Sequence, residues 1–367
     1  MTLLFFEGFE TVGTDLLIAN QATAVTRVSQ RWDAVSAGGV PSSDSFFLIN
    51  DIFSEGYAIQ MGSNGFSNGN YLQFRPLPTT TTGATAAEYI LGFRAHIPST
   101  SRTWNIAQIR SVANNNPHLH ITVTNSADIS VSRNLGGSFF SGSGVLTAGS
   151  WHYIELRFII GNSPYGEVEL LVDGVQIGET LSTDTQDFFG HVDSFRLQTT
   201  NASSGEDYVG FDDIYLLEVD ATAPNDFIGS SSRVVSLPPN GDDTSEWTTS
   251  GGTVHYSLID ENGASDSDFI RHATDLEEDL FDCSNITAGG EVFAIKVEVE
   301  AIAVIEDTHS IDVICKSVAA YSQTNHNVDD LVDYEVFVHY QMTDPNTGSA
   351  WTNSGVDAMV VGVEYNT

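Results

Sequence analysis

Two histidines are spaced for chemistry in the segment 117–123. His118 and His120 stand two residues apart, so on a strand both imidazoles project from the same face. That spacing suits a metal ion such as zinc, which takes imidazole ligands. No third ligand is visible nearby in the sequence, and an exposed sheet face is the favoured interpretation.

Aromatic side chains could bind sugars, because a flat ring covers the face of a sugar well. The candidates are Trp32, Tyr71, Trp104, Phe139 and Phe140. Adjacent residues on a strand point to opposite faces, so we expect one of the two phenylalanines at the surface or at a contact. Packing in the core is the competing interpretation for most of these rings.

The elements that must position these residues are strands. Apolar residues alternate with polar ones in the segment 151–160, where Ile154, Leu156, Phe158 and Ile160 share one face. The same period of two places Val168, Leu170 and Val172 on one face, and Asp173-Gly174 directly after them indicates a hairpin turn. Such runs recur between Gly-, Ser-, Asn- and Asp-rich stretches, which is typical of a sandwich or barrel. The sequence therefore predicts an all-β protein.

The later part of the chain has the same character. Ile295, Val297, Val299 and Ala301 form one predicted apolar face, and Tyr334, Val336, Val338 and Tyr340 form another. The acidic stretch 275–282 is predicted to be a turn or a single helical turn. The segment 219–226 follows a strand-like run and has the composition of a linker. We therefore predict one domain over 1–220 and a second β domain over 221–367.

Charge limits the partners. The chain has 49 acidic and 13 basic residues, a formal net charge of −36. Residues 1–220 carry −14 of it and residues 221–367 carry −22. A field of this sign repels nucleic acids and anionic membranes, so neither is an expected partner. The acidity serves either plain solubility or an acidic docking face.

The sequence shows neither a membrane span nor a signal peptide, and its cysteines are few. No apolar run reaches 18 residues, and the first residues lack the positive start of a signal peptide. The two cysteines, Cys283 and Cys315, do not make a disulfide framework. They could pair, but we favour two small buried residues.

Three segments carry a resemblance to a known superfamily. They are Phe5-Phe6-Glu7-Gly8-Phe9-Glu10, Gly149-Ser150-Trp151-His152 with the strand and Asp173-Gly174 that follow, and Gly210-Phe211-Asp212-Asp213-Ile214. Over about residues 1–220 the chain resembles the concanavalin A-like lectin/glucanase superfamily, in its laminin G-like jelly-roll branch. The resemblance implies a sandwich of two antiparallel sheets, usually with one concave face.

The resemblance also implies two kinds of site to look for. Glucanases of the superfamily use paired carboxylates on one strand. The nearest arrangement here, Glu167 and Glu169, faces away from the apolar side and runs into a turn, so the motif is absent and we expect no enzyme. Jelly-roll carbohydrate modules often hold a calcium ion between their first and last strands. Glu7 or Glu10 together with Asp212 or Asp213 matches that placement, unless these are solvated acids at strand ends.

The end of the chain suggests a setting. Residues 343–352 and 355–362 resemble the C-terminal segment of uncharacterised tailed-phage proteins, in which such a domain follows a jelly roll. We therefore expect a phage virion structural protein on the outside of a capsid or tail, as a decoration, fibre or adaptor subunit made in the host cytoplasm. Its partners would be other virion proteins and copies of itself, typically as a trimer. The alternative is a carbohydrate-binding adhesion module for a host-surface glycan, with calcium holding its loops and Trp104, Phe139 and Phe140 as contacts.

Overall fold

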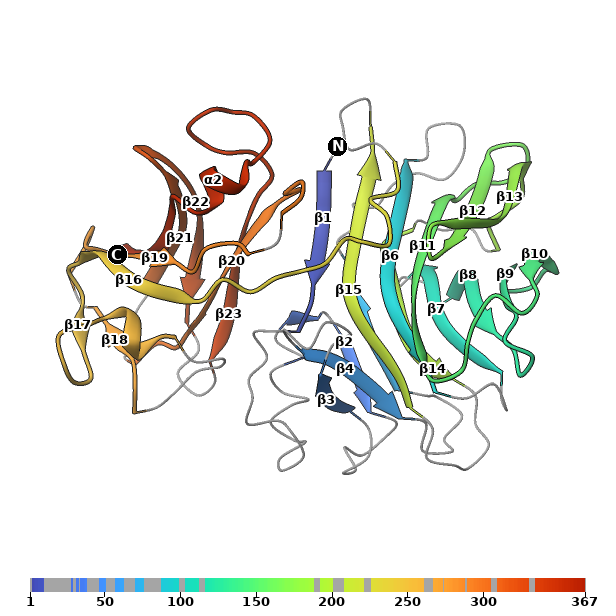
Figure 1. Ribbon diagram of the computed structural model, residues 1–367, viewed down its shortest axis with the longest axis horizontal. Coiled ribbons are helices and arrows are strands. Elements are labelled where there is room, and N and C mark those ends of the chain that lie inside the picture. Colours follow the sequence, from blue (N-terminus) through green and yellow to red (C-terminus); the bar gives the residue numbers. More distant parts are fainter. Residues whose placement is uncertain are drawn as a thin grey trace. The chain divides into compact units, whose positions relative to one another are not determined.

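The protein is represented by a computed structural model in which the chain forms two compact units, Met1–Val235 and Ser236–Thr367 (Figure 1). The structure describes residues 2–9, 28, 31–32, 34–37, 46–50, 57–62, 70–75, 87–98, 103–111, 116–187, 192–200, 208–220, 226–260, 267–272, 274–287, 289–304, 309–329 and 334–366. Strands make up 60% of the structure and helices 3%, and the strands pair antiparallel, which confirms the predicted all-β class.

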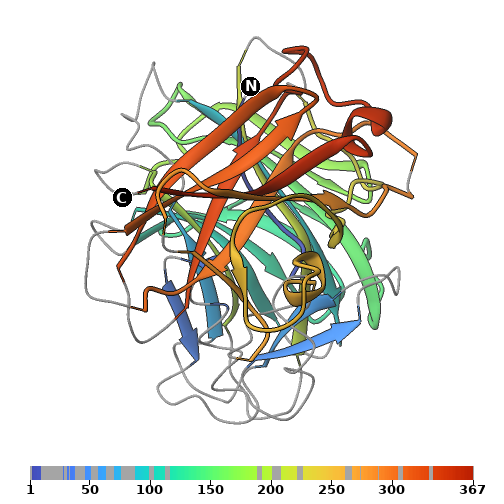
Figure 2. The same cartoon turned by 90° about the vertical axis from the view of Figure 1, so that its left-hand side faces the viewer.

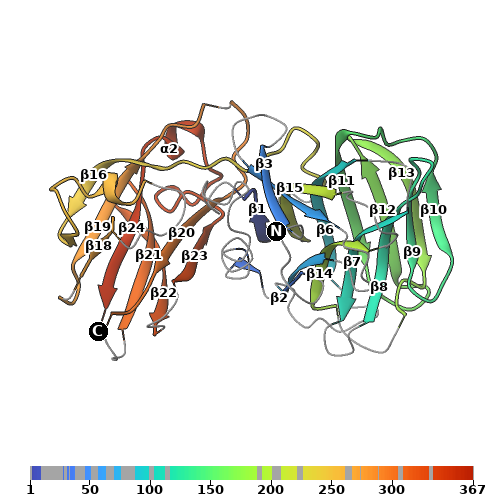
Figure 3. The same cartoon turned by 90° about the horizontal axis from the view of Figure 1, so that it is seen from below.

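The first unit contains two sheets, which Figure 3 shows as separate layers. One has eight strands in the order β13 (Val175–Thr183), β12 (Gly166–Val172), β11 (Ser150–Ile159), β6 (Glu88–Ile97), β15 (Tyr208–Val219), β4 (Tyr57–Gly62) and β3 (Phe46–Asn50), with β1 (Thr2–Glu7) also paired to β15. The other has seven strands in the order β10 (Ser138–Gly142), β9 (Ile129–Arg133), β8 (Asn116–Val123), β7 (Trp104–Ser111), β14 (Ser194–Thr200), β5 (Asn70–Phe74) and β2 (Ala34–Ala37).

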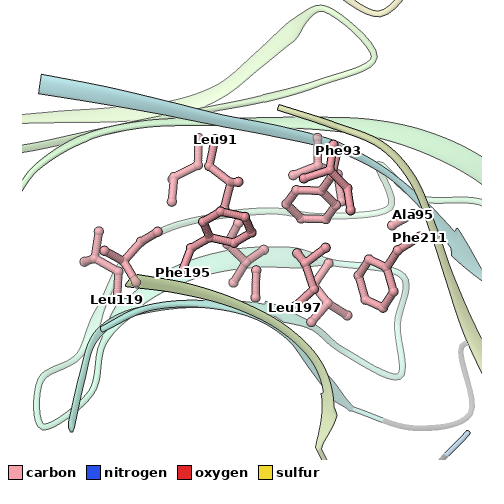
Figure 4. Packing of buried hydrophobic residues seen from close by; sticks show 14 of the residues in the cluster. Leu91, Phe93, Ala95, Leu119, Phe195, Leu197 and Phe211 are labelled. Carbon is pink, nitrogen blue, oxygen red and sulfur yellow. The ribbon is translucent and has the colours of Figure 1, made fainter. Parts of the chain in front are cut away.

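The core of this unit lies between the two sheets. Leu91 and Phe93 of β6 face Leu119 of β8 and Phe195 and Leu197 of β14 across the interior (Figure 4). The alternation predicted for 151–160 and 167–172 is confirmed, since the apolar member of each pair is buried in this core. The inner face of each sheet thus packs in the core, and the outer face of each sheet is available for other contacts.

Three residues that the sequence favoured as sugar contacts lie elsewhere. Trp104 is fully buried in the core, so it cannot stack on a ligand. Phe139 and Phe140 are both half-buried and packed against the same core. The expectation that one of them points outward is wrong, because the register of β10 on β9 shifts between Ser138 and Phe140 and the strict alternation breaks there.

A tight turn joins two strands of the eight-stranded sheet. The predicted hairpin turn is confirmed: Asp173 and Gly174 have φ values of 51° and 77° and join Val172 to Val175 across the turn.

At Gly92 the Tyr215 ring covers the strand so closely that an added Cβ would lie 1.9 Å from a ring carbon. Glycine is therefore required at that position.

The segment 226–235 belongs with the first unit, so the division between units falls after Val235. Arg94 donates to the carbonyl oxygens of Ser230 and Ser232, at 2.8 and 3.0 Å. Val234 N donates to Asp213 Oδ1 at 2.7 Å, and Gly229 N donates to Glu155 at 3.0 Å. These bonds fasten the segment to the outer face of the eight-stranded sheet.

The second unit is a smaller set of sheets, seen in orange and red in Figure 2. Its main sheet has the order β16 (Pro239–Ser245), β19 (Glu278–Cys283), β24 (Met359–Asn366), β21 (His309–Ser317) and β22 (Ala320–Val328). Two strand pairs accompany it, β17 (Thr248–Thr249) with β18 (Ile270–Arg271) and β20 (Ile295–Ala301) with β23 (Glu335–Gln341). The α2 helix (Asn353–Val356) has four residues, and no helix in the described ranges is long and apolar enough to cross a membrane.

Two sequence predictions for this unit need correction. The buried residues of β23 are Phe337 and His339, so the face predicted from Val336 and Val338 is the outer one. His339 is polar but lies on the core side, where the hydroxyl of Thr324 on β22 satisfies its Nδ1 with a hydrogen bond of 2.8 Å. The stretch 275–282, predicted to be a turn or a single helical turn, is a turn only at Asp275 and Leu276, and the strand β19 begins at Glu278.

The two cysteines lie on the strands that flank β24. Asp282, next to Cys283, pairs with Val360, whereas Cys315 pairs with Val361. Two strand spacings separate their Cα atoms by about 10 Å, beyond the reach of about 7 Å for a disulfide. Both thiols are free and buried, and burial raises their pKa to about 12.

Candidate functional site

A row of polar side chains crosses the outer face of the seven-stranded sheet. Gln73 of β5 stands opposite Arg196 of β14, and Arg196 stands opposite Gln108 of β7. Gln108 in turn stands opposite His120 of β8, which is opposite Ser132 of β9. Their neighbours along each strand fill the core, so the period of two turns this row outward. We call these five residues the polar row.

His120 is held by amide side chains. Asn105 Nδ2 and Gln108 Nε2 lie 2.5 and 3.2 Å from His120 Nδ1, and Asn134 Oδ1 lies 2.9 Å from Nε2. Since amide NH₂ groups donate, Nδ1 accepts and the ring proton is on Nε2. Burial lowers the pKa of His120, and the charge of Arg110 acts in the same direction. The imidazole is therefore neutral at neutral pH.

Two arginines flank this histidine. Arg196 donates to Gln73 Oε1 through Nη2 and Nε at 2.6 and 3.2 Å, and its guanidinium lies 3.6 Å from the centre of the Tyr71 ring. Arg110 donates to Gln108 Oε1. Burial lowers the pKa of Arg196 to about 10, with a further contribution from the charge of Arg110. Two positive charges are thus held near one another in a poorly solvated place, with the carboxylate of Asp193 acting on Arg110.

Three other arginines of the unit, Arg94, Arg133 and Arg157, meet carboxylates directly. Arg94 pairs with Asp213 at 2.5 Å, and Arg157 is within 3.4 Å of both Glu88 and Glu169. Arg196 differs, because its hydrogen-bond and ring partners within the described ranges are uncharged. The chain has 49 acidic residues, yet this half-buried guanidinium is bound by an amide and a phenol ring, and an anion is the partner that complements its charge.

The polar row is partly enclosed: Gln73 and Gln108 are buried, as is the adjoining Arg110, whereas the other three members are half-buried. The exposed fractions are 3% for Gln73, 8% for Gln108 and 5% for Arg110. Asn105 Oδ1 is also buried and has no hydrogen-bond partner. Burying polar groups in this way is costly unless they are satisfied, and electrostatic attraction is strengthened where water is excluded. The arrangement suits a charged, hydroxyl-rich ligand better than an apolar one.

The predicted calcium ligands are not brought together as expected. Asp213 faces the guanidinium of Arg94, and Asp212 Oδ1 accepts the backbone N–H of Asp213. Glu10 lies outside the described residues. Among the residues that the structure does describe, no three His, Cys, Asp or Glu side chains are grouped to hold a metal. Calcium therefore stays a prediction from the resemblance alone.

The sequence singled out two residues of this face, His120 and Tyr71, and missed the others. His118 and His120 do share the outer face, but His118 is fully buried and accepts from Asp187 N at 3.3 Å. The missed signal is polar residues at alternate positions of otherwise apolar strands. It occurs three times, as Tyr71 and Gln73, Gln108 and Arg110, and Arg196 and Gln198.

Comparisons with known proteins bear on the fold. No family model matches the chain, and no curated protein matches it. Three similar solved structures are a glucuronan lyase from the fungus Trichoderma reesei, the alginate lyase Aly36B, and a marine alginate lyase from Aplysia kurodai. They are 17%, 11% and 11% identical, with TM-scores of 0.39, 0.39 and 0.41. They cover 50%, 59% and 59% of this chain and 90%, 96% and 100% of their own.

These neighbours correct one expectation. The sequence predicted a protein that is not an enzyme, whereas the similar structures are mainly polysaccharide lyases, so that expectation is withdrawn. Two others are known by names without an activity, a cellulose-induced protein and the binding domain of a mosquitocidal protein. At such low identity the likeness concerns the fold alone, and no link to phage proteins is among these matches. The first unit is an antiparallel β-sandwich, consistent with the jelly-roll fold.

Proposed function

We propose that the outer face of the seven-stranded sheet binds a polysaccharide whose sugars carry carboxylates. The observation that carries this proposal is Arg196, a half-buried guanidinium near Arg110 whose bonding partners are the neutral Gln73 and Tyr71. A uronate carboxylate would supply the missing negative charge through charge-assisted hydrogen bonds. The proposal keeps the carbohydrate alternative that the sequence offered, but it moves the site from the aromatic residues to a polar sheet face.

The neighbouring amides fit the rest of such a sugar. Gln73, Gln108 and Asn105 offer both donors and acceptors, which is what vicinal hydroxyls need. The polar row spans five adjacent strands, about 19 Å at the usual strand spacing. A chain of several sugars lying across the strands would contact all of it. The virion structural role has no comparable support, and we do not propose it.

A binding experiment tests this function. We expect isothermal titration to detect alginate and glucuronan, and to detect dextran, a neutral polysaccharide, at least about tenfold more weakly. Arg196→Gln should abolish the preference, because it removes the charge and keeps much of the length. Arg157→Gln is the matched control, since that arginine lies on the other sheet and meets carboxylates. Equal binding of charged and neutral polymers, or an unchanged Arg196→Gln variant, would refute the proposal.

A second candidate is cleavage of the same polymer by β-elimination, which the neutral His120 favours. The unprotonated ring nitrogen is Nδ1, and once a bound sugar displaces the amides of Asn105 and Gln108 from it, it can take the proton from the carbon beside the uronate carboxylate. The glycosidic C–O bond then breaks, a C=C bond forms, and the leaving oxygen takes a proton from water or a side chain. Arg110 and Gln108 adjoin His120 and would stabilise the charge on the carboxylate.

This activity has a direct readout. The unsaturated product absorbs ultraviolet light, so digestion of alginate or glucuronan can be followed without a label. We expect His120→Gln to lose turnover while it keeps binding, because the amide replaces the base and leaves Arg196 in place. No absorbance change with the unaltered protein would reject cleavage and leave the binding proposal standing.

A further inference from the structure

The five-stranded sheet of the second unit ends in two very different edges. At β16 the edge strand contains Pro239 and the acids Asp242 and Asp243, and its register on β19 shifts twice. Proline, charge and bulges are the usual devices that stop a sheet from pairing with another molecule. This edge is protected.

The opposite edge has none of these devices. The strand β22 runs for nine residues, Ala320–Val328, and pairs with β21 without a register shift. It contains no proline, no lysine and no carboxylate. Its other side has no strand partner in the part of the chain that the structure describes. A long, regular edge of this kind is a template for a further strand.

The β22 edge is uncharged, whereas the rest of its unit is strongly acidic. The unit from Ser236 onward has 25 acidic and 3 basic residues, so two copies repel one another over most of their surfaces. The outward side chains of β22 include Gln323 and Asn325, which hold Asp312 of β21 by hydrogen bonds of 2.6 and 2.8 Å. Asp312 on the adjacent strand is thus already bound by amides of the edge strand, and the exposed Asp329 lies beyond the end of β22. A second copy can approach here with less repulsion than elsewhere.

We propose that β22 is an interface at which two copies of this chain pair edge to edge. Antiparallel pairing of a strand with itself has two-fold symmetry, the commonest arrangement in homo-oligomers. An uncharged strand places no like charges opposite one another in that arrangement, whatever its register. The result is a continuous sheet of ten strands shared by two protomers. This inference does not rest on the polysaccharide proposal.

Sedimentation of the full chain tests the interface. We expect a monomer–dimer equilibrium that shifts to dimer as salt rises from about 0.01 to about 1 M, because the Debye length falls from about 30 to about 3 Å. Hydrogen exchange should slow in β22 amides as the dimer forms. A chain that stays monomeric at every salt and protein concentration would overturn the proposal.

Lysines at the edge make the test specific. Gln323→Lys with Asn325→Lys should weaken the dimer at least about tenfold, because lysines would then face lysines across the two-fold axis. The change also lowers the net negative charge, which by itself would favour association. Thr253→Lys with Ser257→Lys is the matched control on an exposed part of the same unit. An assembly of any size that tolerates the edge lysines, in a variant shown by circular dichroism to be folded, would refute this interface.

Discussion

The two outer faces of the first unit use arginine in opposite ways. On the eight-stranded sheet, Arg94 meets Asp213 and is covered by the segment 226–235. On the seven-stranded sheet, Arg196 meets Gln73 and Tyr71. The first arrangement neutralises its charge within the protein, and the second leaves the charge to be neutralised from outside. The partners of each guanidinium are what assign Arg94 to the structure and Arg196 to the proposed binding site.

The largest expected effect is a loss of stability when Arg94 is replaced on the outer face of the eight-stranded sheet. Arg94→Ala removes the guanidinium from Asp213, whose side chain is only 4% exposed, and from two carbonyls of the 226–235 segment. We expect a loss of about 3–5 kcal/mol in the free energy of unfolding, as for other buried ion pairs with one partner removed. Urea denaturation measures it. Arg94→Met with Asp213→Asn should lose less, and a single-variant loss below about 1 kcal/mol would show that the pair is not structural.

The next-largest effect is expected from substitutions of Arg196 on the proposed ligand-binding face of the seven-stranded sheet. Arg196→Ala should cost little stability but weaken polyuronate binding by about 10- to 100-fold, the equivalent of one or two charge-assisted hydrogen bonds. Arg196→Lys should recover part of the loss, since it restores charge without the two-pronged contact to Gln73. Titration calorimetry and urea denaturation on the same variants separate the two effects. A variant that unfolds more easily but binds normally would reverse the comparison.

A smaller effect concerns acid on the structural face. Burial raises the pKa of Glu155 above 4.5, although Tyr215 and Gly229 donate to Oε1. A carboxyl with a raised folded-state pKa stabilises fully at pH values below 4.5, and this contribution is lost as pH rises through the folded pKa. Glu155→Gln should therefore gain stability relative to the unaltered protein as pH rises from about 4 to about 8, because the amide never ionises. Unfolding free energies that stay parallel over this range would contradict the assignment.

The smallest effect concerns acid on the ligand-binding face. Because the pKa of His120 is lowered from 6.5, its charge appears only in more acidic solution. Polyuronate affinity should therefore be constant from about pH 8 to 6.5 and rise modestly below it, as His120 adds a positive charge. His120→Gln should abolish that rise in titrations over the same range. A change in affinity centred above pH 6.5 would mean that another group controls binding.

Much of the fold follows from local pattern. The alternation in 151–160 and 167–172 and the Asp173-Gly174 pair correctly predicted buried faces and a hairpin, because these depend on neighbours along the chain. The prediction failed where alternation alone was used to choose a face. In β23 the more apolar side is the outer one, and at Phe139 a register shift puts two successive rings against the core.

The sequence by itself determined the strands, their turns, the acidity of both units and the fact that His118 and His120 share a face. Only the tertiary structure decided which strands are neighbours. Gln73 and Arg196 are 123 residues apart and become direct partners because β5 and β14 lie side by side. A period of two tells which residues of one strand share a face, but it contains nothing about the order of strands in a sheet. The candidate site is made by that order, which is why its members could not be grouped before the fold was known.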